Sequence, residues 1–299
     1  MYILLFILIV ASSVSAHIGD QIYFIPEITD DALGQLDVRD RNLDDWRAVI
    51  SGPVLTAADL VPSPDVGEGA PYDPADMDYQ IWLGWNNSTN RLYFAMGRTD
   101  DVFVHEYDGG NPTSLWQYDS HVTFIVDGDH SGGDFTGSAD ETWSDEEKTL
   151  NMGRIAQRYQ AIAEAPDDRF IGVDGSAASW VSESPYADGG GEVTRGTPAT
   201  SLLEFYVTPF DDLIWNSPED SVPSDLAAGK IIGLQISVPD FDTKPRAYRS
   251  LHSLVPPFPG WHIWRYSEHL VDARLISGQE DSAVENRSWA RIKASFRRK

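Results

Sequence analysis

Two runs of alternating residues decide the fold: Arg91-Leu92-Tyr93-Phe94-Ala95-Met96 and His121-Val122-Thr123-Phe124-Ile125-Val126. In each run the second, fourth and sixth residues are apolar. Successive side chains of a strand point to opposite faces of a sheet, so each run predicts a strand with one buried face.

Similar runs recur along the chain, at Tyr79–Gly84, Gln157–Ala163, Ser201–Val207, Ile231–Val238 and Val271–Ile276. Within Ser201–Val207, period two places Leu203, Phe205 and Val207 toward the core and Glu204 and Tyr206 away from it. Segments rich in Gly, Pro and Asp separate the runs, and Asp188-Gly189-Gly190-Gly191 reads as a flexible turn. Many short strands and few amphipathic helices predict an all-β, antiparallel, jelly-roll-like β-sandwich with long loops.

The two ends of the chain differ from this pattern. The apolar run Ile3–Val10 and the small residues up to Ala16 predict a signal peptide over residues 1–16, with a buried strand as the alternative. The run is shorter than the ~20 residues that span a bilayer. We therefore expect a secreted, periplasmic or cell-surface protein without membrane insertion. Residues 17–284 form the expected sandwich domain. Residues 285–299 form a basic tail, either a short docking helix or an irregular segment, with six basic residues against Glu285, that could dock onto an acidic partner.

Composition excludes several classes of function. The formal net charge of −25 argues against binding to nucleic acid or to anionic membranes, which require a basic face. The absence of Cys excludes disulfides, thiolate metal sites and a cysteine nucleophile. So many carboxylates repel one another unless salt or bound cations neutralise them, which makes structural calcium the expected cofactor.

The segment Asp127-Gly128-Asp129-His130-Ser131-Gly132-Gly133-Asp134 resembles the opening of a calcium loop. Asp127, Asp129, Ser131 and Asp134 are the predicted metal ligands, because their oxygens can turn inward while the glycines permit a tight wrap. The alternative is a solvated turn between strands.

No catalytic residue is predicted. The histidines show no His-x-x-x-His spacing, and the sequence contains no Gly-x-Ser-x-Gly elbow. With 47 acidic residues, a pair of carboxylates suited to glycoside hydrolysis can always be found, so such a pair carries little weight. Trp46, Trp82 and Trp85 fit packing in the core or at its rim, whereas Trp116, Trp261 and Trp264 fall in loops where an indole ring could face a ligand.

Ordered blocks of the chain resemble family 9 carbohydrate-binding modules and their relatives with the DOMON-like sandwich. The blocks are Gln80-Ile81-Trp82, Arg91-Leu92-Tyr93-Phe94, Thr99-Asp100-Asp101, Leu115 to Ser120, Val122 to Asp127, Leu203-Glu204-Phe205 with Pro209-Phe210, Ile231 to Ile236 with Asp240, and Ala273 to Ile276. The resemblance covers most of the chain after the signal peptide.

The resemblance implies a sugar end held between two tryptophan rings, with structural calcium. Trp116, before Asp119-Ser120, matches the first ring, and Trp264 matches the second. Thr123 stands where the family has a ligand-contacting Glu, and the family's Asn falls near Trp261. For the family's supporting Arg, both Arg158 and Tyr159 are candidates.

We therefore expect a non-catalytic protein that binds a glycan or polysaccharide. A structural or surface-attachment sandwich without a sugar site is one alternative, and a glycoside-active enzyme with paired carboxylates is another. Haem-binding relatives ligate iron with Met and Lys, and here Met96 lies on a strand but no lysine partner stands out.

Overall fold

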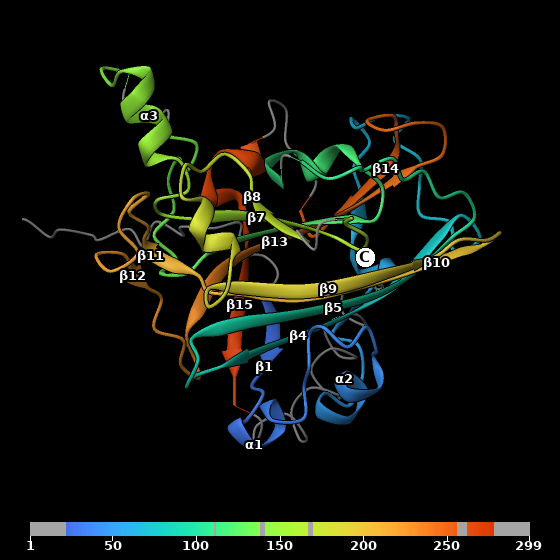
Figure 1. Cartoon of the computed structure of the whole chain (residues 1–299), viewed down its shortest axis with the longest axis horizontal. Helices are drawn as coiled ribbons and strands as arrows, with labels where there is room; N and C mark the ends of the chain where they lie inside the picture. Colours follow the sequence, from blue (N-terminus) through green and yellow to red (C-terminus); the bar gives the residue numbers. More distant parts are fainter. Residues whose placement is uncertain (1–21, 111, 138–140, 167–169, 256–261, 278–299) are drawn as a thin grey trace, which may run out of the picture.

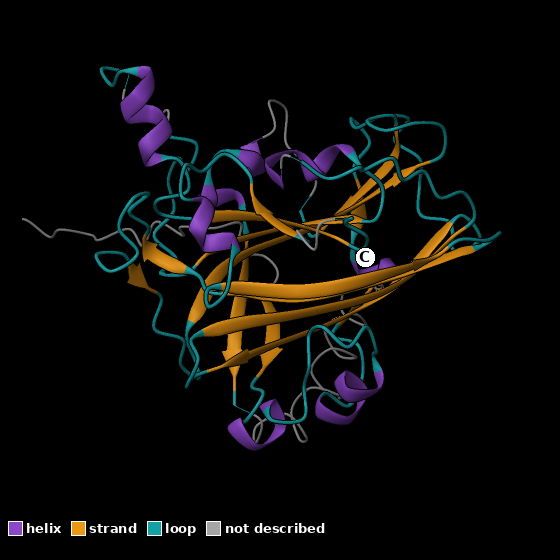
Figure 2. Ribbon diagram, viewed as in Figure 1, coloured by secondary structure: helices purple, strands orange, loops and turns teal. Residues whose placement is uncertain are grey.

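A computed structural model describes residues 22–110, 112–137, 141–166, 170–255 and 262–277 of the chain. Two sheets pack face to face, as Figures 1 and 2 show. The eight-stranded sheet has the order β1-β15-β13-β6-β7-β8, with β14 beside β13 and β3 beside β14. The five-stranded sheet has the order β2-β4-β5-β10-β9, and β11 and β12 form a separate pair. The predicted β-sandwich is therefore confirmed.

The strands of the eight-stranded sheet are β1 (Ile22–Pro26), β3 (Val61–Pro62), β6 (His121–Asp127), β7 (Gln157–Ile162), β8 (Ile171–Val173), β13 (Ile231–Phe241), β14 (Tyr248–Ser253) and β15 (Val271–Ile276). Those of the five-stranded sheet are β2 (Leu55–Thr56), β4 (Met77–Asn86), β5 (Arg91–Asp100), β9 (Ala187–Thr194) and β10 (Ala199–Val207). The remaining pair is β11 (Phe210–Asp212) and β12 (Val222–Pro223). Every strand predicted from an alternating run is present.

The core between the sheets has the composition that the alternation predicts. Phe94 of β5 stacks on Phe205 of β10, with ring centroids 4.7 Å apart, and meets Phe124 of β6 edge to face at 6.0 Å. All three side chains are buried. The apolar faces of the two sheets thus meet through aromatic rings, which bury large apolar areas.

Short helices and long connections cover the outer faces of both sheets. The α-helices are α1 (Asp30–Leu33), α2 (Asp44–Val49) and α3 (Asp145–Asn151). The 3₁₀-helices are η1 (Ala57–Asp59), η2 (Pro112–Gln117), η3 (Ser179–Ser182), η4 (His262–Trp264) and η5 (Ser267–His269). α1 and α2 lie against the outer face of the five-stranded sheet, below it in Figure 1. Within the described ranges, no helix is long and apolar enough to cross a membrane.

Two features depart from the expectations. β1 pairs in parallel with β15, whereas the other pairings between named strands are antiparallel. The triple glycine at 189–191 is not a turn but lies within β9. A Cβ at Gly189 would lie 2.3 Å from the Glu204 carbonyl oxygen, and one at Gly191 would lie 2.4 Å from that of Ala163. These glycines permit the close approach of neighbouring backbone segments, whereas the composition of the run alone suggests a flexible turn.

Candidate functional site

The outer face of the eight-stranded sheet, which points away from the core, brings together most of the predicted sugar-contacting residues. Thr123 and Ile125 of β6 lie opposite Gln160 and Arg158 of β7 in the strand register. Their sequence neighbours Val122, Phe124 and Tyr159 belong to the core, so Thr123 and Arg158 point outward. η2, which carries Trp116, packs over β7 and β8.

A chain of polar contacts joins the two tryptophan segments across β7. The backbone N–H of Trp116 donates to Gln160 Oε1 at 2.6 Å, and Gln160 Nε2 donates to Asp174 Oδ2 at 3.2 Å. Arg158 Nη2 pairs with the same Asp174 oxygen at 2.8 Å, and Arg158 Nη1 donates to the Trp264 carbonyl at 3.2 Å. The segments that carry the two rings are therefore positioned by neighbouring side chains of one strand.

The electrostatics of this polar chain are set by burial. Burial raises the pKa of Asp174, and the neighbouring Arg158 guanidinium opposes that shift. Burial also lowers the pKa of Arg158, against the attraction of Asp174. Arg158 Nε is buried and has no hydrogen-bond partner among the described residues. The ion pair thus retains one unused donor on the face that carries the tryptophans.

Both predicted ligand-stacking rings are half-buried. The Arg246 guanidinium lies over the Trp116 ring, 4.9 Å from its centroid. Trp264 packs against the small apolar cluster that contains Ile125 and Leu270. Trp261 lies outside the described residues. A role of these rings in sugar contact stays a prediction.

Sequence reasoning left one assignment open and missed two residues. Of Arg158 and Tyr159, Arg158 faces outward, whereas Tyr159 is buried and its hydroxyl donates to the Thr208 carbonyl at 2.7 Å. Gln160 was missed, although its position two residues after Arg158 places it on the same face. Asp174 lies just after β8, and no sequence signal connects it with β7.

A buried ion network fixes the Trp116 segment to the core. Arg98 Nη2 donates to Asp119 Oδ1 at 2.7 Å and also contacts Asp100, while Nη1 donates to the Pro239 carbonyl at 3.0 Å. Asp119 lies two residues after η2 and also accepts from the backbone N–H of Val104. Burial raises the pKa of Asp119 to about 6, although Arg98 lowers it.

A carboxylate cluster lies next to this network, where three strands begin or end. Asp76 precedes β4, Asp101 follows β5 and Asp242 follows β13, and oxygens of all three lie within 4.8 Å of one another. Arg249 Nε contacts Asp76 at 2.7 Å and Asp242 at 3.1 Å. The Oδ1 atoms of Asp101, Asp242 and the adjacent Asp240 are buried, with no hydrogen-bond partner among the described residues.

The pKa values in this cluster reflect crowding of buried acids. Burial raises the pKa of Asp242 to about 6, which Arg249 opposes and Asp76 reinforces. Burial raises the pKa of Asp240 to about 8, although the neighbouring Arg98 guanidinium lowers it. Several carboxylate oxygens from converging strand ends are the donor set that a hard cation such as calcium prefers, so the residues fit this metal.

The predicted calcium turn is a compact loop after β6. Asp127 Oδ2 accepts from the Gly132 N–H at 2.9 Å, and Asp129 Oδ1 accepts from the Ser131 N–H at 3.1 Å. The Asp134 carboxylate accepts from the Thr136 N–H and from Arg265 Nε, each at 2.8 Å.

Among the described residues, two clusters of three acidic side chains have mutually close oxygens: Asp40–Asp45–Glu204 and Asp76–Asp101–Asp242. Neither cluster includes a residue of this turn. Calcium at the turn stays a prediction.

Comparison with known proteins gives the fold. No protein-family model matches the chain, and no curated protein matches it. The solved structures that it resembles include a family 9 carbohydrate-binding module from Caldicellulosiruptor kristjanssonii in complex with cellotriose. That match has a TM-score of 0.51 and 11% identity, and covers 88% of this chain and 98% of that one. A module of the same family and organism in complex with glucose gives a TM-score of 0.49 and 12% identity, covering 88% and 100%. The chain thus has the β-sandwich fold of a family 9 carbohydrate-binding module, as the ordered sequence blocks predict.

Proposed function

We propose that this protein is a non-catalytic carbohydrate-binding protein whose glycan site lies on the outer face of the eight-stranded sheet, between Trp116 and Trp264. The observation that carries the proposal is the polar chain from Trp116 through Gln160, Asp174 and Arg158 to Trp264. Such a chain positions two aromatic segments relative to each other, which a binding site requires and a solvated surface does not. The cellotriose complex of a structurally similar module supports the same ligand class.

Two neighbouring outward side chains of β7 hold the two segments: Gln160 binds the backbone of Trp116, and Arg158 binds that of Trp264. In this proposal the indole faces contact sugar C–H groups, and the Arg158–Asp174 ion pair keeps the Trp264 segment in place. Thr123 is 2% exposed and lies beneath the site rather than at its surface.

Two tryptophan variants test the site. Trp116→Ala and Trp264→Ala should each weaken cellotriose binding at least tenfold in calorimetric titration, because aromatic residues at the centre of a site contribute most of its binding energy. Trp215→Ala is the matched control, since Trp215 is one of the exposed large hydrophobic residues and lies between β11 and β12. Wild-type binding by both site variants would refute the assignment. Failure of the wild-type protein to bind any member of a glycan array would refute the function and favour a purely structural sandwich.

Calcium that braces the loops is the second part of the proposal. The Asp76–Asp101–Asp242 cluster supports it, because unpaired buried carboxylate oxygens are costly unless a cation or proton satisfies them. Calcium bound only to the folded state at a hundred times its dissociation constant would stabilise the protein by about 2.7 kcal/mol.

Two asparagine variants distinguish the two candidate metal positions. Asp242→Asn should abolish the rise in melting temperature that calcium causes if the cluster is the site, and Asp127→Asn should do so if the turn is. A melting temperature of the wild-type protein that does not respond to calcium or to EDTA would refute both.

Export is the third part, and it rests on the apolar run before Ala16. Expression of the full-length gene in its native host should yield an extracellular or envelope-associated protein that begins at His17. Amino-terminal sequencing that finds residues 1–16 retained would refute it.

A further inference from the structure

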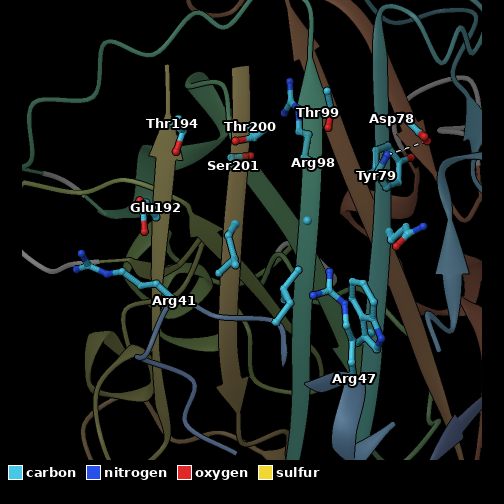
Figure 3. Close-up of a pocket in the computed structure, with 15 residues that line it drawn as sticks. Arg41, Arg47, Asp78, Tyr79, Arg98, Thr99, Glu192, Thr194, Thr200 and Ser201 are labelled. Carbon is cyan, nitrogen blue, oxygen red and sulfur yellow. Dashed lines mark hydrogen bonds between the residues drawn. The ribbon is translucent and has the colours of Figure 1, made fainter. Parts of the chain in front are cut away.

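A groove lies on the side of the sandwich opposite the proposed glycan site, on the outer face of the five-stranded sheet, and Figure 3 shows it. Its volume is about 490 Å³. This is within the range of about 300–1,000 Å³ that small-molecule sites occupy. α2 and the segment before it cover one part of this face, where Trp46 donates to the buried Glu204, and leave the neighbouring strip open.

The floor of the groove consists of two rows of residues that cross four strands. In register across β9, β10, β5 and β4, the first row is Thr194, Thr200, Thr99 and Asp78, and the second is Glu192, Leu202, Gly97 and Gln80. Four strands at a spacing of about 4.8 Å give the floor a length of about 14 Å. This is long enough for an extended ligand rather than for a single ion.

The wall comes from the segment that leads into α2. Leu43 closes over Gly97, where an added Cβ would lie 3.0 Å from the Leu43 Cδ1 atom. Arg41 and Arg47 also line the groove, near β9 and β4 respectively (Figure 3), and the Arg47 guanidinium lies over the Trp82 ring, 5.6 Å from its centroid. A side chain at position 97 would therefore narrow the floor against this wall.

Trp82 supplies an unused donor at one end of the groove. Its side chain is 2% exposed, it lines the groove, and its Nε1 has no hydrogen-bond acceptor among the described residues. A buried indole N–H normally has a partner. Because the nitrogen itself is buried, a ligand oxygen in the groove would satisfy it once the side chains over the indole shift.

The side chains of the groove select a neutral, hydroxyl-rich ligand. Arg41 and Arg47 balance Asp78 and Glu192, so the exposed charges of the lining cancel. A strongly anionic ligand would also be repelled by a protein of net charge −25. Carboxylates, guanidinium groups, the Gln80 amide and a row of threonine hydroxyls together accept and donate hydrogen bonds, as do the hydroxyl groups of a saccharide.

We infer that this groove is a second saccharide site, which takes a neutral oligosaccharide across β4, β5, β10 and β9 with an oxygen on the Trp82 indole N–H. The choice of a saccharide among hydroxyl-rich ligands rests on the proposed function. The protein then has two sites on opposite faces and can bridge two glycan segments or bind one polysaccharide with avidity.

The test follows the indole N–H resonance of Trp82 in ¹H–¹⁵N correlation spectra of the full chain, assigned with Trp82→Phe. Cellohexaose and xylohexaose are the probes. We expect this resonance to shift on titration in the wild-type protein and equally in Trp116→Ala/Trp264→Ala, in which the first site is removed. In Gln80→Ala/Thr99→Ala, which removes two floor hydrogen-bonding groups, the apparent affinity at Trp82 should fall at least fivefold.

The matched control is Gln35→Ala/Thr243→Ala, which changes the same residue types at exposed positions outside the groove and should match wild type. A Trp82 resonance that stays fixed while the Trp116 and Trp264 resonances shift would overturn the second site alone. Equal affinity at Trp82 in wild type and in Gln80→Ala/Thr99→Ala would overturn it too. A wild-type protein in which no indole resonance responds to either probe or to a glycan array would overturn the proposed function together with this inference.

Discussion

Replacement of Arg98 by methionine tests whether the buried ion network supports the Trp116 segment. The Arg98 side chain is 1% exposed, and its guanidinium contacts the Asp100 and Asp119 carboxylates and the Pro239 carbonyl. Removal of one partner from a buried ion pair costs about 3–5 kcal/mol, because the other charge remains buried and uncompensated. Here two carboxylates lose the same partner, so we expect a loss of at least about 3 kcal/mol in the free energy of unfolding.

Urea unfolding measures this loss, with Arg154→Met as the control. Arg154 pairs with Asp212 at 2.6 Å, but both side chains are more than a third exposed, and such pairs contribute at most about 1 kcal/mol. Arg98→Lys keeps the charge and should lie between wild type and Arg98→Met. If Arg98→Met does not fold at neutral pH, Arg98→Lys still gives a measurable comparison with Arg154→Met.

The pH dependence gives a second, independent criterion. The pKa of Asp119 is raised to about 6 in the folded protein, above its unfolded value of 3.8, so its protonation favours folding. That contribution is present below the unfolded pKa and is lost as the pH rises through about 6. Without Arg98 the pKa rises further, so the cost of Arg98→Met should be larger at pH 8 than at pH 5. A cost no greater than that of Arg154→Met, or an equal cost at both pH values, would refute the reasoning.

Three further predictions concern the five-stranded sheet. Burial raises the pKa of Glu204 to about 8, so its ionisation should lower wild-type stability between pH 5 and pH 9 by on the order of 4 kcal/mol. Glu204→Gln should reduce the loss measured in urea titrations by that amount, while the contribution of buried Asp240 remains; an unchanged loss would contradict this. Trp46→Phe removes the indole N–H that donates to Glu204 at 2.6 Å, and should lower the free energy of unfolding by about 1–3 kcal/mol. The measurement is the urea midpoint at pH 9, and an unchanged midpoint would count against the hydrogen bond. Gly191→Ala should lower the free energy of unfolding by about 1–3 kcal/mol through overpacking. The control Gly52→Ala, where no atom lies within 4 Å of the added Cβ, should stay within about 0.5 kcal/mol of wild type. Equal thermal-unfolding midpoints for the two variants would disprove the close approach at Gly191.

The architecture could be predicted from the sequence because alternation is a local property. The runs in β5, β6 and β10 each assign one face to the core, and the structure places those faces there. The alternation does not show what covers the other face. Glu204 points away from the core as expected, yet it is buried, because α2 places Trp46 against it.

The candidate site could be predicted only in part, because its contacts join distant segments. Trp116, Trp264 and Arg158 could be selected from the sequence, but the link through Asp174 depends on how β7 pairs with β8. The acids at 100 and 119, which contribute to the family resemblance, form ion pairs with buried Arg98. Sequence spacing cannot show such a pairing, since the partners come from different strands and loops.

The parallel pairing of β1 with β15 determines how the sandwich responds to tension. The register runs from Ile22 opposite Asp272 to Pro26 opposite Ile276, so a pull on Ile22 and Ile276 acts along the strands in opposite directions. The hydrogen bonds between these strands are then loaded together in shear rather than broken one after another. A protein that holds a glycan at one face while it is pulled at its two ends would therefore resist mechanical unfolding at the pair of strands where force enters.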